Sequence, residues 1–223
     1  MTDHTADLAG GLADRLVRTE ESGLDAGLLV PLLRLLVDGH PVAVEDLADA
    51  AGRSEDDVRA GLALVPDTEY DEQGRIVGQG LTLRPTVHRF AVDGNDLYTW
   101  CALDTLAFPA LLARPARIES TSPTSGQTVR VTVDPTEGVT RVEPTTAVVS
   151  LIDPERIASI RSSFCNQVHY FASPEDAEEW LAEHPDAQVV TVAEAHRLGS
   201  ALAAAFLDGL ERPTGGPGGR PCC

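Results

Sequence analysis

Helical patterns and strand patterns occupy different parts of this 223-residue chain, and this ordering constrains the fold more than any other feature. Apolar residues recur with helical spacing over residues 8–19, 24–37, 44–51 and 54–64. Runs rich in β-branched residues then follow at 69–77, 116–133, 147–152 and 167–171. A helical first part followed by a strand-rich second part predicts an α+β fold.

The first part has the pattern of a winged helix over about residues 24–83. Ser54 is placed to cap the second helix of a helix–turn–helix, and the first turn of that helix is acidic, with Glu55, Asp56 and Asp57. A hairpin around the turn at 72–74 follows as the wing. Such a module either binds DNA or serves as a scaffold. An acidic helix in the recognition position would repel phosphate, which favours the scaffold interpretation.

The second part is expected to form a mixed α/β domain around a small, mostly antiparallel sheet. Its remaining predicted elements are a short strand at 189–192 and helices at 95–112, from Ser173 to about 183, and at 193–210. We therefore expect three parts: a winged-helix-like N-terminal helical domain at 1–83, a mixed domain at 84–212 and a flexible tail at 213–223.

The charge of the chain argues against a nucleic-acid or membrane partner. The formal net charge is −18, and all 17 basic residues are Arg, whereas phosphate contacts need clustered cations. The longest apolar stretch, 24–37, is interrupted by Asp25, Pro31 and Arg34 and is too short to span a bilayer. The first residues lack the pattern of a secretory signal. We expect a soluble, cytoplasmic protein.

The cysteines are the residues with the greatest chemical potential. They are Cys101, Cys165, Cys222 and Cys223. A disulfide scaffold is not expected in a cytosolic chain of this size. No pair has C-x-x-C spacing, so a structural zinc site is disfavoured.

Cys101 and Asp104 stand three residues apart on the predicted helix and would share one face of it. The surroundings are apolar, and burial raises the pKa of a thiol unless something offsets it. A buried thiol beside a carboxylate is therefore a candidate for proton relay. The alternative is that Cys101 is a small buried hydrophobic residue, as most free cysteines are.

Cys165 precedes the strand at 167–171, and its alternative role is also packing. Two cysteines on either side of an α+β core could instead converge on a soft metal ion, because thiolates select soft ions and Hg(II) is softer than Zn(II). His169, His88 and His196 show no ligand spacing and are interpreted as structural.

The tail ends in the vicinal pair Cys222-Cys223 after a stretch rich in Gly and Pro. The pair is either an incidental exposed feature or a tethered dithiol that captures and hands on a soft metal ion. A linker of this composition is flexible enough to act as an arm.

Two runs of the sequence closely resemble the cysteine motifs of the bacterial alkylmercury lyases. They are LYTWCALDTLAFPAL at 97–111 and SFCNQVHYFAS at 163–173. The segment GLTLR at 80–84 and the winged-helix pattern also fit, so the resemblance covers about residues 24–210. Many relatives carry a further cysteine directly after the second motif cysteine, where this chain has Asn166.

The resemblance implies an organomercurial lyase that cleaves a carbon–mercury bond to a hydrocarbon and Hg(II), for mercury detoxification. It implies that Cys101 and Cys165 are the two essential thiols, that Asp104 is their acidic partner, and that all three contact mercury. No organic cofactor is implied, and cellular thiols would release the product. The Cys222-Cys223 tail resembles the C-terminal pair of mercuric reductases, the expected Hg(II) acceptors.

Two other functions remain possible from the residues. A mercury-responsive winged-helix regulator would use the same thiols to sense the metal and the N-terminal module to bind DNA, which the acidic helix disfavours. A mercury carrier without catalysis would need no proton donor three residues after Cys101, so Asp104 argues against it.

Overall fold

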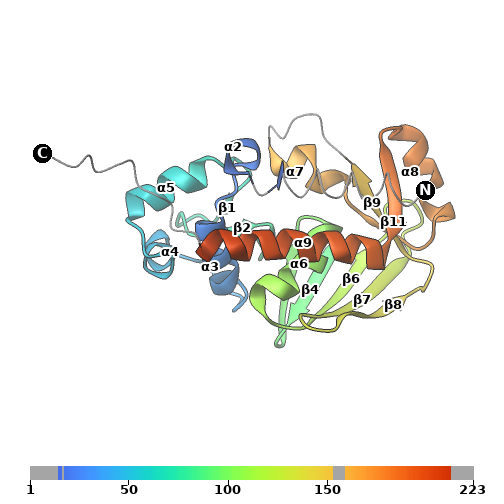
Figure 1. Ribbon diagram of the computed structural model, residues 1–223, viewed down its shortest axis with the longest axis horizontal. Coiled ribbons are helices and arrows are strands. Elements are labelled where there is room, and N and C mark those ends of the chain that lie inside the picture. The colour runs from blue at the N-terminus through green and yellow to red at the C-terminus, as the bar shows by residue number, and fades with distance from the viewer. Residues whose placement is uncertain (1–14, 17, 153–158, 212–223) are drawn as a thin grey trace, which may run out of the picture.

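The structure is a computed structural model that describes residues 15–16, 18–152 and 159–211 (Figure 1). Most of the helix expected at 8–19 and the whole tail with Cys222 and Cys223 lie outside these residues. The α+β class is confirmed, because a group of N-terminal helices precedes two antiparallel sheets. Within the described residues, no helix combines the length and the apolar character that a membrane span requires.

The N-terminal helices are α2 (Thr19–Ser22), α3 (Ala26–Leu36), α4 (Val44–Ala51) and α5 (Glu55–Ala63). Helix α3 is the buried one, with Leu32, Leu33 and Leu36 fully inaccessible; burial of each such side chain stabilises the fold by about 1.5–3 kcal/mol. Ser54 caps α5 by accepting a hydrogen bond from the Asp57 N–H, as predicted.

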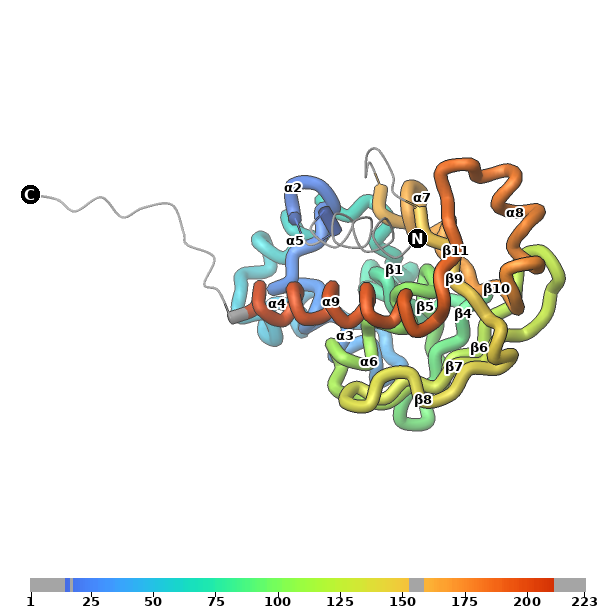
Figure 2. The backbone as a smooth tube through the Cα atoms, turned by 45° about the vertical axis from the view of Figure 1, so that its right-hand side comes forward, coloured from blue at the N-terminus to red at the C-terminus, as the bar shows by residue number. Residues whose placement is uncertain are grey.

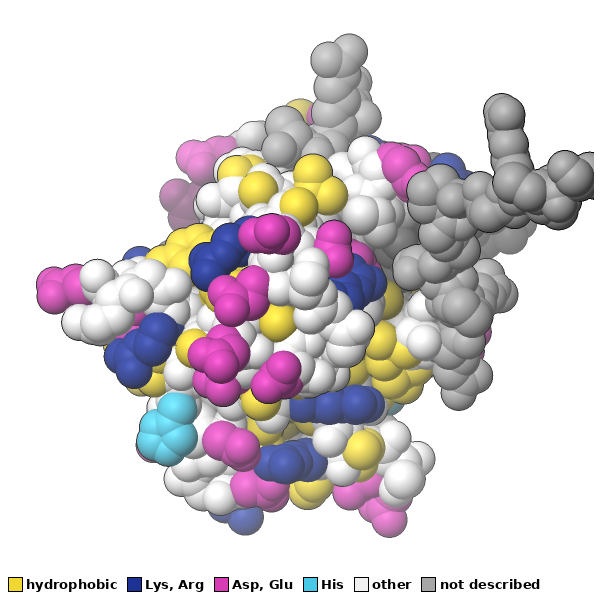
Figure 3. Space-filling model, turned by 90° about the vertical axis from the view of Figure 1, so that its left-hand side faces the viewer, with side chains coloured by type: hydrophobic (Ala, Val, Ile, Leu, Met, Phe, Trp, Pro, Cys, Tyr) yellow, Lys and Arg dark blue, Asp and Glu magenta, His cyan; other side chains and the backbone are white. Residues whose placement is uncertain are grey.

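Both arginines around this turn are engaged by acids of the module itself. Arg53 binds Asp25 at 2.5 Å, and Arg59 binds Glu55 at 2.7 Å. The face that carries α4 and α5 gathers acidic side chains (Figure 3), among them the exposed Glu45, Asp46, Asp49, Glu55, Asp56 and Asp57.

One eight-stranded antiparallel sheet runs through most of the molecule in the order β1-β2-β3-β5-β4-β6-β7-β8. Its strands are β1 (Glu69–Tyr70), β2 (Ile76–Gln79), β3 (Leu81–Thr82), β4 (His88–Val92), β5 (Asn95–Thr99), β6 (Ala116–Thr121), β7 (Thr128–Asp134) and β8 (Gly138–Glu143). The predicted wing is thus the hairpin β1–β2, and it continues into the sheet. The sheet is larger than expected, because β3, β4, β5 and β8 were not predicted.

Helices α6 (Ala102–Leu112) and α9 (Val192–Glu211) pack on each other along the buried side of this sheet (Figure 1). Their approach depends on Gly199, where an added Cβ would lie 3.1 Å from the backbone nitrogen of Ala107. In β4 and β7 every second residue is buried, as expected for strands with one covered face.

A three-stranded antiparallel sheet, in the order β10-β9-β11, forms the second layer. It comprises β9 (Val148–Ile152), β10 (Tyr170–Phe171) and β11 (Ala187–Thr191), with α7 (Ile160–Ser163), the 3₁₀ turns η1 (Cys165–Gln167) and η2 (Glu175–Ala177), and α8 (Glu178–Glu183) between them. Ser173 caps the chain ahead of α8 as predicted, accepting a hydrogen bond from the Asp176 N–H. Helix α7 lies next to β1 although they are far apart in sequence (Figure 2).

The prediction of one helix over 95–112 is wrong in its first half. Residues Asn95–Thr99 form β5, which pairs with β4 through a tight turn at Asp93 and Gly94, both with positive φ (50° and 87°). An Asp-Gly pair of this kind is a hairpin signal, and it predicts a turn before a strand rather than the start of a helix. The helix therefore begins only after Cys101.

Candidate active site

Three of the predicted site residues meet in the fold. The sulfur atoms of Cys101 and Cys165 and a carboxylate oxygen of Asp104 all lie within 4.8 Å of one another. Both thiols are buried and free, and Asp104 is half-buried. In the described part of the chain, no other group of three or more His, Cys, Asp or Glu side chains comes together in this way.

Cys101 is the N-cap residue of α6 rather than a residue of its second turn. Its sulfur accepts a hydrogen bond from the Asp104 N–H at 3.4 Å, and Asp104 Oδ2 accepts one from the Cys101 N–H at 3.2 Å. This is a capping box with cysteine in the place of serine. Cys101 and Asp104 were expected to share one face of a helix. They are joined instead by the two hydrogen bonds of this cap. The cap puts the thiol at the positive end of the helix, where a thiolate is favoured.

Cys165 begins the 3₁₀ turn η1, and the strand expected after it at 167–171 is shorter, because β10 starts only at Tyr170. One backbone hydrogen bond ties its segment to that of Cys101, because the Ala102 N–H donates to the Val168 carbonyl at 3.0 Å. This bond joins the backbone that follows Cys101 to the backbone that follows Cys165.

The electrostatics favour the protonated forms of the three side chains. Burial, the hydrogen bond with Cys165 and the charge of Asp104 raise the pKa of Cys101 well above its usual value. The hydrogen bond with Cys101 lowers the pKa of Cys165, but burial and the neighbouring carboxylates outweigh it and the net shift is upward. Burial raises the pKa of Asp104 to about 6, against the hydrogen bonds from Cys101. Two protonated thiols therefore face a carboxyl group that can take or give a proton near neutral pH.

A mainly apolar cavity of about 60 Å³ reaches both Asp104 and Cys165. Aromatic and aliphatic side chains line it, including Trp100, Leu103, Phe108, Phe164, Leu202 and Phe206. The Trp100 indole N–H is buried there without a hydrogen-bond partner. The cavity can therefore hold a small organic group next to the thiols.

The histidines lie apart from the three clustered side chains. His88 is buried, and its Nδ1 lies 2.8 Å from Ser120 Oγ. Its ring stacks with that of His169, and the two ring centroids are 6.2 Å apart. Burial, with a contribution from His169, lowers the pKa of His88 to about 3, so its ring is neutral. His196 packs against Gly138.

Sequence reasoning missed the residues that surround the cysteines from outside the two motifs. Arg161 lies over the Trp100 ring, with Cζ 4.9 Å from its centroid, and pairs with Glu69. Tyr170 Oη lies 2.8 Å from the hydroxyl of Thr105, the residue after Asp104. The one feature of the sequence that points to Arg161 is its position four residues before Cys165.

Comparison with known proteins gives a consistent result. Residues 81–204 match the alkylmercury lyase family, and residues 7–80 match the helix-turn-helix domain of alkylmercury lyase. The chain is 57% identical to an alkylmercury lyase of Streptomyces lividans over 183 residues, which is 82% of this chain and 85% of that protein. It is 49% identical to that of Staphylococcus epidermidis over 88% of both chains, and 50% identical to that of Pseudomonas putida over 85% of this chain and 89% of that protein.

A crystal structure described as the mercury-bound form of MerB2 has the same fold. Its TM-score is 0.72 at 23% identity, over 91% of this chain and 98% of that chain.

Proposed function

The chain belongs to the alkylmercury lyase family and is an organomercurial lyase, and from this premise we propose that Cys101, Cys165 and Asp104 perform the cleavage. The observation that carries the proposal is the meeting of two thiols and one carboxyl group within 4.8 Å beside an apolar cavity. The organic group of an alkyl- or arylmercury compound occupies the cavity, and its mercury atom lies among the three side chains.

The first step is exchange of thiols on mercury. The substrate enters as R–Hg–SR′, the adduct of an organomercury cation with a cellular thiol. One enzyme thiol forms a bond to mercury, the Hg–SR′ bond breaks, and R′SH leaves with the proton of that enzyme thiol. The raised pKa of both buried thiols means that this proton must be removed as the bond forms, which Asp104 can assist.

The second step breaks the carbon–mercury bond. The other thiol adds to mercury and passes its proton to the Asp104 carboxylate. The additional sulfur ligand increases the electron density on the Hg–C bond. The Hg–C electron pair then takes the proton from Asp104, which yields the hydrocarbon, leaves Hg(II) on two thiolates and returns Asp104 to its ionised form. Holding all three groups around one atom supplies the proximity effect.

The reaction needs no organic cofactor, because every proton and electron pair comes from the enzyme side chains and the substrate. Low-molecular-weight thiols extract Hg(II) from Cys101 and Cys165, and a mercuric reductase accepts it. Cys222 and Cys223 serve as the intermediate dithiol in this transfer. Because extraction requires reduced thiols, the cytoplasm is the compartment in which the enzyme turns over.

Hydrocarbon release tests the proposed residues. The protein is mixed with methyl- or phenylmercury and excess thiol, and methane or benzene is measured in the headspace for wild type, Cys101→Ser and Cys165→Ser. Serine is itself a good N-cap, so Cys101→Ser keeps the cap of α6 and removes only the sulfur. Release by wild type and by neither variant is expected; release by either serine variant would exclude the two-thiol mechanism.

Asp104→Ala separates cleavage from capture. The variant is expected to bind Hg(II) and to release no hydrocarbon. A variant that still cleaves would remove Asp104 from the proton path.

A further inference from the structure

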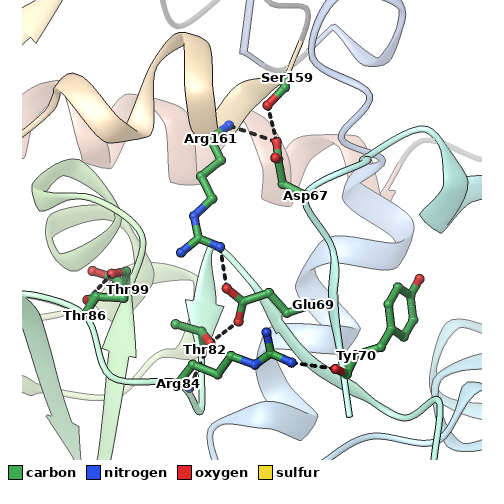
Figure 4. A network of polar contacts seen from close by, with 9 residues as sticks. All are labelled: Asp67, Glu69, Tyr70, Thr82, Arg84, Thr86, Thr99, Ser159 and Arg161. Carbon is green, nitrogen blue, oxygen red and sulfur yellow. Dashed lines mark hydrogen bonds and ion pairs between the residues drawn. The ribbon is translucent and has the colours of Figure 1, made fainter. Parts of the chain in front are cut away.

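A network of polar contacts joins the N-terminal hairpin to the segment before Cys165 (Figure 4). On one side are Asp67, two residues before β1, and Glu69, the first residue of β1. On the other are Ser159 and Arg161, at the start of α7. The network crosses from one part of the chain to another over more than 90 residues of sequence.

Asp67 caps α7 from outside that helix. Its Oδ2 accepts hydrogen bonds from the Ser159 hydroxyl and from the Arg161 N–H, the latter at 3.2 Å. Ser159 in turn caps α7 by accepting from the Ser162 N–H. The first turn of α7 is therefore fixed to β1 through one carboxylate.

Arg161 links both cysteine segments to the same strand. Its guanidinium donates to Glu69 and lies over the ring of Trp100, the residue before Cys101. Glu69 is almost completely buried, and its second oxygen accepts from the Thr82 hydroxyl at 2.5 Å. Glu69 thus binds a cation on one side and a neutral donor on the other, as a buried carboxylate requires.

The fold makes room for this carboxylate at Gly78. A Cβ at Gly78 would lie 2.5 Å from Glu69 Oε2 and 2.6 Å from Thr82 Oγ1. Glycine at the β1–β2 pairing position opposite Glu69 therefore leaves the space that Glu69 occupies.

We propose that Asp67 and Glu69 form a latch that holds α7 in place, and that Arg161 is a positioning residue which keeps Cys165 facing Cys101. This inference rests on the proposed two-thiol mechanism and gives the N-terminal module a role in it. Phe164 and Cys165 follow α7 directly, so a shift of α7 moves the second thiol, whereas Cys101 stays fixed by the cap of α6. A displacement of about 1 Å at a reacting group can lower a rate by about a hundredfold.

The test compares Arg161→Gln with a matched control, Arg84→Gln. Arg84 also binds β1, because it donates a hydrogen bond to the Tyr70 carbonyl at 2.6 Å. None of the hydrogen bonds drawn in Figure 4 joins Arg84 to α7. Arg161→Gln is expected to lower kcat for hydrocarbon release by about ten- to hundredfold, with KM changed much less because the apolar cavity is intact. Arg161→Lys keeps a cation near Glu69 and Trp100 and should recover part of the rate. Arg84→Gln should match wild type.

A second readout follows the thiols directly and needs no cleavage. In full-length protein with Cys222→Ser and Cys223→Ser, one equivalent of Hg(II) is added and the loss of free thiols is followed in time. Both thiols should disappear together in wild type. In Arg161→Gln the second thiol, identified as Cys165 by peptide mapping, should disappear in a slower phase. A single phase in Arg161→Gln, or a kcat equal to that of Arg84→Gln, would overturn the latch.

Loss of Arg161 leaves a buried charge on Glu69, which can destabilise the fold. The double variant Glu69→Gln/Arg161→Gln removes both charges and replaces the single variant if that variant unfolds. Slower loss of the Cys165 thiol than in wild type would support the latch. Loss of both thiols at the wild-type rate would overturn it. If wild type itself releases no hydrocarbon, the proposed function fails. The loss of free thiols on addition of Hg(II) still tests the latch in that case.

Discussion

Asp104 performs two tasks with one side chain, because its carboxylate completes the cap of α6 and lies beside both thiols. The cap and the burial of this carboxylate compete energetically, because the hydrogen bonds with Cys101 favour its ionised form and burial favours its protonated form. Burial raises its pKa to about 6, so the fold favours the protonated form. The ionised form that the reaction needs as a proton acceptor is therefore the costly one. At this residue the fold gives up stability for chemistry, as often occurs at active sites.

The competition has a measurable pH dependence. A carboxyl group with a raised pKa in the folded state contributes stability that is complete below its unfolded pKa and is lost as the pH rises through about 6. At pH 8, Asp104→Asn should therefore have a free energy of unfolding about 1–3 kcal/mol above that of wild type and a higher unfolding temperature. Near pH 4 the two proteins should differ little. In wild type, kcat/KM should rise with pH through about 6. Thermal unfolding and initial rates across pH 4–8 measure both.

Asp208→Asn makes the same change of side chain at an exposed position of α9 and is the matched control. A stabilisation by Asp104→Asn that is as large at pH 4 as at pH 8 would show that proton linkage is not its cause.

At the scale of elements, the site depends on how closely α6 and α9 approach. Gly199→Val places a branched side chain where even a Cβ would lie 3.1 Å from the α6 backbone. The helices must separate, and α6 carries Cys101 at its start and Asp104 in its first turn. We expect a loss of about 1–3 kcal/mol in unfolding free energy and a lower kcat. Ala204→Val, on the exposed side of the same helix, should change neither by much; equal effects of the two variants would show that the close approach of α6 and α9 is not the cause of the loss.

The elements also mark the limits of sequence reasoning. Helices with clear caps, such as the one after Ser54, were predicted correctly because capping is local. The three clustered residues could be named because their motifs are specific. The helix predicted over the residues of β5 is wrong, because the apolar spacing of this short segment fits either a helix or a strand. Its pairing with β4, which the spacing does not reveal, makes it a strand. Arg161 was missed because its partners on β1 are distant in sequence.

At the scale of the whole molecule, the charge distribution favours a scaffold over a DNA-binding module. Arg53 and Arg59, at the helix–turn–helix, are paired with acids, and the face that carries α4 and α5 gathers acidic side chains (Figure 3). We expect no salt-dependent binding to duplex DNA in fluorescence anisotropy at about 10 μM protein, because phosphate contacts need unpaired cations. Tight binding that weakens steeply with salt would contradict this, and a scrambled duplex would tell whether it is sequence-specific.

The Ala102–Val168 hydrogen bond brings together two cysteines that emerge from the ribosome at different times. At about 5–20 residues per second, Cys165 is synthesised roughly 3–13 s after Cys101. During that interval a nascent chain has one site thiol and no partner for it. A mercurial bound to that thiol can be neither cleaved nor released to a second site sulfur. During synthesis, such a mercurial can therefore leave the chain only by exchange with a cellular thiol.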